Sequence, residues 1–151
     1  MARRPFQFRL ERVREMRVRT EDEAKEELAR SMALRARSEQ LLLEAAQRVQ
    51  AARSGQLGAA SGGVGIEQML AHQAFIERAE REAQAAEIEL SRQDAEVDAR
   101  RVALQEAARE RQVLDQLKDK QEAAHRREAE RVESNQIDEL ALAMHRRRSA
   151  A

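Results

Sequence analysis

The chain has 151 residues, of which 37% are charged and three are aromatic, and its 28 basic and 28 acidic residues balance. Its hydrophobic share of 42% includes 29 alanines, which bury little area, so large apolar side chains are too few for a globular core. The balanced charge gives no overall attraction to nucleic acid or membrane, and no apolar run is long enough for a transmembrane helix. Without cysteine or an apolar signal core, we expect a cytoplasmic protein that is not secreted through a cleaved signal.

The first predicted helix covers residues 8–53, and the only proline, Pro5, suits the turn before it. Its apolar seam advances by three or four residues at a time, through Leu10, Val13, Arg17, Thr20, Ala24, Leu28, Ser31, Leu34, Ser38, Leu41, Ala45 and Val49 or Ala52. Many of these side chains are small or polar. The helix should therefore pack closely and weakly, and depend on a partner helix.

The next segment, residues 54–65, holds all five glycines of the chain. Glycine loses the most backbone entropy on ordering, so such a cluster predicts a flexible linker. A phosphate-binding loop would need a preceding strand and a following Gly-Lys-Ser/Thr, and neither is present.

The second predicted helix covers residues 66–146, and no proline, glycine or cysteine interrupts residues 66–145. Its apolar residues recur every seven positions, at Met69, Ile76, Ala83, Leu90, Val97 and Leu104. A seven-residue repeat keeps one seam turned toward a partner helix, which argues against disorder and for a coiled coil. At 1.5 Å per residue the helix would be about 120 Å long. We therefore predict an all-α fold, a single domain over residues 1–151 in which two long helices form an antiparallel coiled-coil hairpin.

The two predicted helices differ in length, so the first should cover the second only to about residue 110. The register slips in the same region, because the interval after Leu104 lands on Arg111. We expect the rest of the second helix to overhang, with an apolar stripe formed by Leu114, Leu117, Ala124, Val132, Ile137, Leu140 and Met144. Such a stripe indicates a partner protein or self-association, although a lone charged helix also tolerates some exposed apolar residues.

Catalytic and metal-binding patterns are weak. His72, His125 and His145 are too far apart along the rod to form one site, and Glu122-x-x-His125 is a single copy of a motif that di-iron bundles use twice. Acidic pairs such as Glu26-Glu27 lie on a solvated helix with no cleft to shift their pKa. We predict no enzyme activity, no catalytic residues, no metal, no cofactor and no small-molecule substrate.

Arginine is concentrated at both ends, with seven in residues 1–19 and three at Arg146, Arg147 and Arg148. Basic helices bind phosphate backbones, but an acidic protein surface is an equally good target. There is no basic-region leucine-zipper layout, and we predict no nucleic-acid partner.

Each end of the chain carries a distinctive motif. The N-terminal motif is Phe6-x-Phe8-x-Leu10-Glu11-x-Val13, followed by Arg17 and Glu21-x-x-Ala24. The C-terminal motif is Leu114-x-x-Leu117-Lys118-x-Lys120-Gln121, followed by Glu128, Arg131, Glu133 and Ile137-Asp138-Glu139-x-Ala141. These motifs resemble those of the flagellar export proteins called FliJ, and their order, the chain length and the two-helix layout extend the resemblance over the whole chain.

The resemblance implies a component of the flagellar type III protein export apparatus, cytoplasmic and peripherally associated with the inner-membrane export machinery. Members of that family look like the central stalk of rotary ATPases. The implied partners are the hexameric flagellar export ATPase, the cytoplasmic part of the export gate protein, and export chaperones. On this basis the ATPase-binding residues would be Leu10, Val13, Leu114, Leu117, Gln121, Ile137, Asp138, Glu139 and Leu140. The gate-binding residues would be Gln40 and Phe75, with Ile76 contributing.

The heptads alone also fit a coiled-coil adaptor or stalk of a related virulence-type secretion system, or a generic scaffold protein. A homodimer formed through the overhang is a further open possibility.

Overall fold

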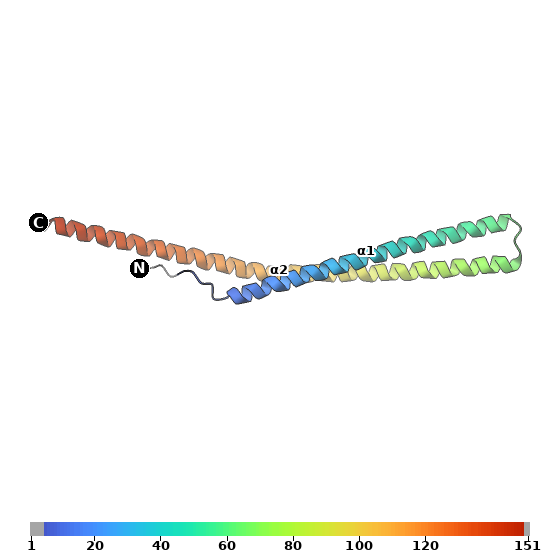
Figure 1. Cartoon of the computed structure of the whole chain (residues 1–151), viewed down its shortest axis with the longest axis horizontal. Coiled ribbons are helices and arrows are strands. Elements are labelled where there is room, and N and C mark those ends of the chain that lie inside the picture. The colour runs from blue at the N-terminus through green and yellow to red at the C-terminus, as the bar shows by residue number, and fades with distance from the viewer. Residues whose placement is uncertain (1–4, 150–151) are drawn as a thin grey trace. The chain divides into compact units, whose positions relative to one another are not determined.

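The computed structural model describes residues 5–149. These residues form two helices, α1 (Glu11–Ser61) and α2 (Ile66–Ser149), and no strand occurs among them (Figure 1). The all-α prediction is confirmed. The helices contribute to two compact units. We call residues 22–106 the turn unit, and residues 5–21 together with 107–149 the terminal unit. Whether the chain behaves as a single domain stays a prediction.

In the turn unit the two helices run antiparallel, as their ion pairs show. Along α1, Arg35 pairs with Asp94 at 2.6 Å, Arg48 with Glu82 at 3.2 Å, and Arg53 with Glu80 at 2.6 Å. The partner number falls as the α1 number rises, which is the register of a hairpin closed by the connection between α1 and α2. The predicted two-helix hairpin is therefore confirmed.

The seven-residue repeat of α2 forms the seam. Ile76 and Val97 are buried, and Ala83, Leu90 and Leu104 are partly buried. Met69, closest to the turn, is 36% exposed. The repeat thus faces the partner helix along the length of the turn unit and loosens only at its end.

The seam of α1 is built from small side chains. Ser31, Ser38, Ala45 and Ala52 are buried, and they too are seven residues apart. The buried Ser31 hydroxyl donates to the carbonyl of Leu28 at 2.9 Å, so its burial leaves no polar atom unsatisfied. Side chains this small let the two helices approach closely but contribute little buried apolar area.

Within the turn unit, two residues assigned to this seam from the sequence were wrong, and in the terminal unit Leu10 and Val13 are also more than a third exposed. Leu34 is 55% exposed and Leu41 is 44% exposed, whereas Arg35 and Leu42 are partly buried. The correct path steps four residues from Ser31 to Arg35 and from Ser38 to Leu42. A sequence trace that always prefers the larger apolar residue misses this path, because Arg35 reaches the seam to pair with Asp94.

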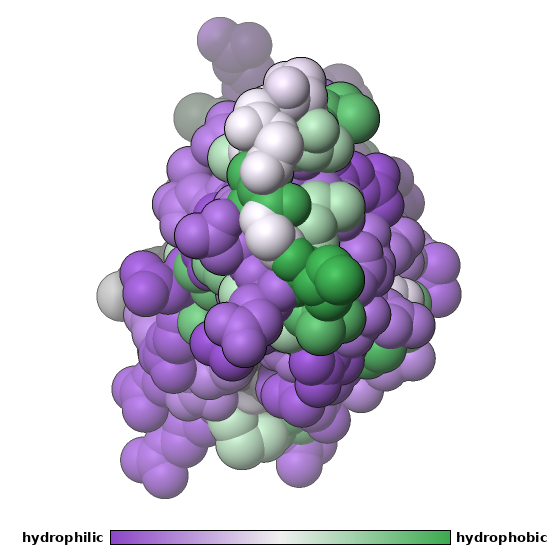
Figure 2. Space-filling view, turned by 90° about the vertical axis from the view of Figure 1, so that its right-hand side faces the viewer, coloured by the Kyte–Doolittle hydropathy of each residue, from purple (hydrophilic) through white to green (hydrophobic). Residues whose placement is uncertain are grey.

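The connection between the helices is shorter than the predicted linker of residues 54–65. Helix α1 continues to Ser61, so only residues 62–65 form the turn. Gly63 has the only positive φ among the described residues, at 74°, which glycine adopts without strain. The backbone N–H of Gly62 donates to the carbonyl of Ala59 at 3.1 Å and closes the helix. Figure 2 looks onto this end of the turn unit, where a strip of apolar and pale residues lies between hydrophilic ones.

The linker prediction failed because Gly55 and Gly58 remain helical. Each costs only about 1 kcal/mol relative to alanine inside a helix. The neighbouring residues Leu57, Ala59 and Ala60 favour helix, and Gln56 donates across to Gln73 at 3.3 Å. Glycine spacing alone could not separate the helical glycines from those of the turn.

In the terminal unit the pairing extends further than predicted. Arg17 pairs with Glu110 at 2.7 Å, and Glu11 pairs with Lys118 at 2.8 Å, so α1 covers α2 to about residue 118 rather than 110. Because the turn is shorter and α1 longer than predicted, the start of α1 lies opposite residue 118 rather than residue 110. Beyond it α2 does overhang, and residues 130–149 are all exposed.

Helix α1 begins at Glu11 rather than residue 8. Phe8 is buried, with 8% of its surface exposed, and its carbonyl accepts a hydrogen bond from the Glu11 N–H at 3.1 Å. Residues 5–10 thus form a non-helical strap in the terminal unit. Because the chain is not helical here, the strap can bury the Phe8 ring in the terminal unit.

Candidate functional site

The residues assigned to the ATPase all lie in the terminal unit, in three parts. Leu10 and Val13, 39% and 38% exposed, belong to the strap and the first turn of α1. Leu114 and Leu117 are partly buried in the paired part of α2, and Gln121 is exposed. Ile137, Asp138, Glu139 and Leu140 are on the overhang. The structure brings the first two parts together and leaves the third as a separate surface.

The paired part is held by a charge network. Arg14 Nε donates to Asp115 Oδ1 at 2.6 Å, and Arg111 bonds both Asp115 and Glu21. The Arg14 hydrogen bond lowers the pKa of the Asp115 carboxyl. The Glu21 hydrogen bond raises the pKa of the Arg111 guanidinium. Arg14, Arg111 and Asp115 are therefore held in their charged forms, which favours the pairing of α1 with α2 at neutral pH.

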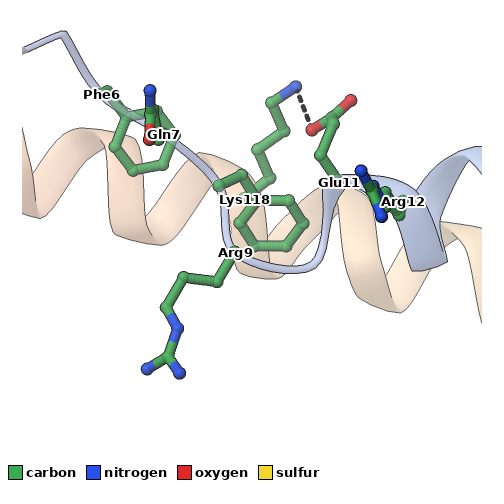
Figure 3. A pocket seen from close by; sticks show the side chains of 7 residues that line it. Phe6, Gln7, Arg9, Glu11, Arg12 and Lys118 are labelled. Carbon is green, nitrogen blue, oxygen red and sulfur yellow. Dashed lines mark hydrogen bonds and ion pairs between the residues drawn. The ribbon is translucent and has the colours of Figure 1, made fainter.

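A second link joins Glu11 to Lys118, whose Nζ donates to Glu11 Oε2 at 2.8 Å and lowers the pKa of that carboxyl. Figure 3 shows these two side chains reaching toward each other while Arg9 points away. Both side chains line an open pocket of about 510 Å³, and so do the two aromatic residues of the strap. The lining residues are Phe6, Gln7, Phe8, Arg9, Glu11, Arg12 and Lys118. The pocket is made by the strap, and its walls are mostly long charged or polar side chains that suit a protein contact better than a small molecule.

The strap also contacts α2 further along. The ring of Phe6 lies against that of His125, with centroids 5.8 Å apart and planes tilted by 53°. His125 is exposed, and neither its contact with Phe6 nor the network of Arg14, Arg111 and Asp115 was predicted from the sequence. A signal was available: once α1 is aligned antiparallel to α2, Glu11 and Arg14 face Lys118 and Asp115 with opposite charges at matching spacing.

The overhang presents an apolar stripe. Ile137, Leu140 and Met144 follow at intervals of three and four and are 60%, 65% and 69% exposed. This spacing places them on one face of the helix. Asp138 and Glu139 lie beside the stripe, and Arg146, Arg147 and Arg148 occupy the last turn. An apolar face bordered by charges of both signs is typical of a helix that binds another protein in a defined orientation.

The residues assigned to the export gate lie in the turn unit. Phe75 is 55% exposed and lines a pocket of about 360 Å³ with Arg48, Ala51, Ala52, Gly55 and His72. Phe75 is therefore largely exposed on the surface of the hairpin. Ile76 is 5% exposed, so it supports this surface from below and is not itself available for contact.

Gln40 is exposed and donates to Glu44 at 3.3 Å. It lies eleven residues before Ala51, on the order of 16 Å along α1, so the structure does not bring it into the Phe75 pocket. Gln40 and Phe75 could share a partner only if that partner spans several turns of the hairpin.

Among residues 5–149, no group of three or more histidine, cysteine, aspartate or glutamate side chains is placed to hold a metal ion. Over the same residues, neither helix has a stretch apolar enough to cross a membrane.

Comparison with known proteins agrees with the motifs at the two ends. The family profile described as flagellar FliJ protein matches residues 6–150, nearly the whole chain. Searches of curated proteins and of solved structures returned no match. A profile match of this extent, together with a two-helix fold, shows that the chain belongs to the flagellar FliJ family, a component of the flagellar protein export apparatus.

Proposed function

We propose that this protein is a non-catalytic stalk of the flagellar export apparatus that binds the hexameric export ATPase through its terminal unit. The observation that carries the proposal is the overhang, where Ile137, Leu140 and Met144 expose a continuous apolar face. Exposed apolar surface of this kind is unfavourable in water and favours burial against a partner. The family supplies the context in which an ATPase ring is the natural partner.

The terminal unit offers the ATPase two different surfaces. The paired part, with Leu10 and Val13 partly exposed beside the charge network, is a two-helix surface. The overhang is a single helix. A ring of identical subunits that closes around such an uneven rod would contact it unequally, and this could bias the subunits into different states. In this way the stalk would couple nucleotide turnover to export without doing chemistry itself.

The turn unit would serve the export gate. An exposed phenylalanine beside an apolar pocket is a good anchor for a protein contact, because aromatic side chains contribute strongly where they become buried. Phe75 and its pocket meet that description. We further propose that the protein is cytoplasmic, associates peripherally with the export machinery at the inner membrane, and escorts export chaperones, as the family resemblance implies.

The overhang assignment is tested by Ile137→Asp, with Leu142→Asp as the matched control. Both residues are well exposed, at 60% and 58%, so neither variant should unfold the chain. Leu142 is two positions from both Leu140 and Met144, which puts it on the opposite side of the helix. Titration calorimetry with the purified ATPase should show that Ile137→Asp weakens binding at least tenfold while Leu142→Asp leaves it nearly unchanged. Equal affinities for both variants and the natural chain would refute the assignment.

The gate assignment is tested by Phe75→Ala. Removing the ring should weaken binding to the cytoplasmic part of the gate protein by about tenfold, since a buried aromatic anchor is worth roughly 1–2 kcal/mol or more. Leu43→Ala, also in the turn unit and 53% exposed, is the control. Binding can be followed by surface plasmon resonance with the gate domain immobilised. An unaltered affinity for Phe75→Ala would mean that the pocket is not the gate-binding site.

A further inference from the structure

The end of the turn unit is unlike the rest of the chain in its charge. Residues 54–74 contain one formally charged residue, Glu67, although 37% of the whole chain is charged. Ile66 and Leu57 are the most exposed large apolar side chains among residues 5–149, at 81% and 75%, and Leu70 is 65% exposed. We call Leu57, Ile66 and Leu70, with the partly buried Val64 of the turn, the apolar tip.

The apolar tip is compact along the hairpin. Ile66 and Leu70 are one turn apart at the start of α2, and Leu57 is one turn before the end of α1. The view onto this end shows a strip of apolar and pale residues at the front, with hydrophilic residues on both sides of it (Figure 2). Apart from Glu67, this surface has no formal charge with which to attract a partner, so its recognition should be mainly apolar.

Most backbone groups near the tip form hydrogen bonds within the chain. The Gly62 N–H donates to Ala59, and the Met69 N–H donates to the Gly65 carbonyl at 3.1 Å. Open backbone groups are therefore confined to the turn and to the helix ends on either side of it. Unpaired backbone groups are tolerated at the headgroup level of a bilayer, where water and lipid oxygens can bond them, but not in the hydrocarbon. This limits the tip to shallow insertion.

We propose that the apolar tip inserts into the headgroup and upper acyl region of a lipid bilayer, which makes it a membrane-surface contact independent of the ATPase and gate surfaces. A second copy of the chain is a poorer occupant, because a few side chains at two helix ends fall well short of the roughly 800 Å² per partner that stable interfaces bury. A bilayer needs no matching pocket and accepts a convex apolar tip. Since the tip carries no basic residue, its binding should depend on neither anionic lipid nor low salt.

The test is flotation of the full-length protein with vesicles of pure phosphatidylcholine, at about 0.1 M and about 0.5 M NaCl. The natural chain should float at both salt concentrations. The variant Leu57→Ser/Ile66→Ser/Leu70→Ser should float about tenfold less, because three large apolar side chains are lost. The control Leu34→Ser/Leu43→Ser/Ile88→Ser changes three residues of the same unit that are 55%, 53% and 64% exposed, and should float like the natural chain.

A site-specific readout separates insertion from adsorption elsewhere on the rod. The chain has no cysteine, so Val64→Cys and Ser91→Cys can each be labelled with a polarity-sensitive dye. Vesicles should shift the emission of the dye at position 64 to the blue and leave the dye at position 91 unchanged. The proposal is overturned if the natural chain does not float on phosphatidylcholine, if salt abolishes flotation, or if both labelled positions respond alike. Salt-sensitive flotation restricted to anionic vesicles would instead implicate the arginines of the last turn of α2. None of these outcomes bears on ATPase binding.

Discussion

Asp115 accepts hydrogen bonds from two arginines, Arg14 of α1 and Arg111 of its own helix. Arg111 also bonds Glu21, a buried carboxylate with 7% of its residue surface exposed. Asp115 therefore connects the two helices of the terminal unit at a point where few apolar side chains are buried. Because exposed ion pairs are individually weak, the strength of this pairing lies in several charges acting as a network.

The network predicts a pH dependence that centres on Asp115. Its pKa is lowered from the ordinary value of 3.8, chiefly by the Arg14 hydrogen bond, so the folded terminal unit binds the proton less tightly than the unfolded chain does. The stabilisation is thus fully present above pH 3.8 and is lost as the pH falls through the lower folded value. Asp115→Asn should lower the urea midpoint at pH 7. Between about pH 6 and pH 3 the urea midpoint of this variant should fall less than that of the natural chain.

The control for this prediction is Asp119→Asn, one turn further along α2 and exposed. It should leave both the urea midpoint and its acid dependence close to those of the natural chain. If the two variants showed the same acid dependence, Asp115 would not be the group responsible.

Single residues were the hardest level to predict. The aromatic strap residues Phe6 and Phe8 were recognised in the sequence as family motif positions, but their burial depends on a break in the helix that no local pattern marks. Leu114 and Leu117 were expected on the overhang and are partly covered by α1 instead. In each case the error came from the register between two distant segments, which a single sequence does not specify.

At the level of whole helices, prediction was more successful. The repeat from Ile76 to Leu104 identified the inward face of α2 correctly, because large side chains seven residues apart leave one choice of seam. The seam of α1 could not be identified with the same certainty from the sequence. Its buried residues are serines and alanines, whereas nearby leucines that are exposed look like better seam residues. The glycine cluster indicated the position of the turn but not its length.

The distinction between helical and turn glycines predicts opposite effects of alanine. Gly58 lies within α1, where an added methyl group would meet no neighbouring side chain within 4 Å, and Gly58→Ala should gain about 1 kcal/mol of stability. Gly63 has a φ of 74°, so Gly63→Ala should cost about 1 kcal/mol. Thermal unfolding followed by circular dichroism gives both values. A stabilising Gly63→Ala, or a destabilising Gly58→Ala, would contradict the observed end of α1.

For the molecule as a whole, the proposed roles divide along the chain. The family and the export apparatus follow from the profile match over residues 6–150. The terminal unit carries the overhang and the strap, and the turn unit carries the Phe75 pocket and the apolar tip. The fold class and the hairpin could be predicted from the heptad repeat and the motifs at the two ends. The binding surfaces could be predicted only in part, because the exposure of residues on α2 depends on how far α1 covers that helix.

The central claim is that the terminal unit acts on the export ATPase. The most direct measurement titrates this protein into the flagellar export ATPase of the same organism, and follows oligomeric state by light scattering and nucleotide turnover in the same samples. We expect the ATPase to assemble into hexamers and turn over faster as the protein is added, and Ile137→Asp to remove both effects while Leu142→Asp retains them. An ATPase whose assembly and turnover are unchanged by the folded natural chain would contradict the claim.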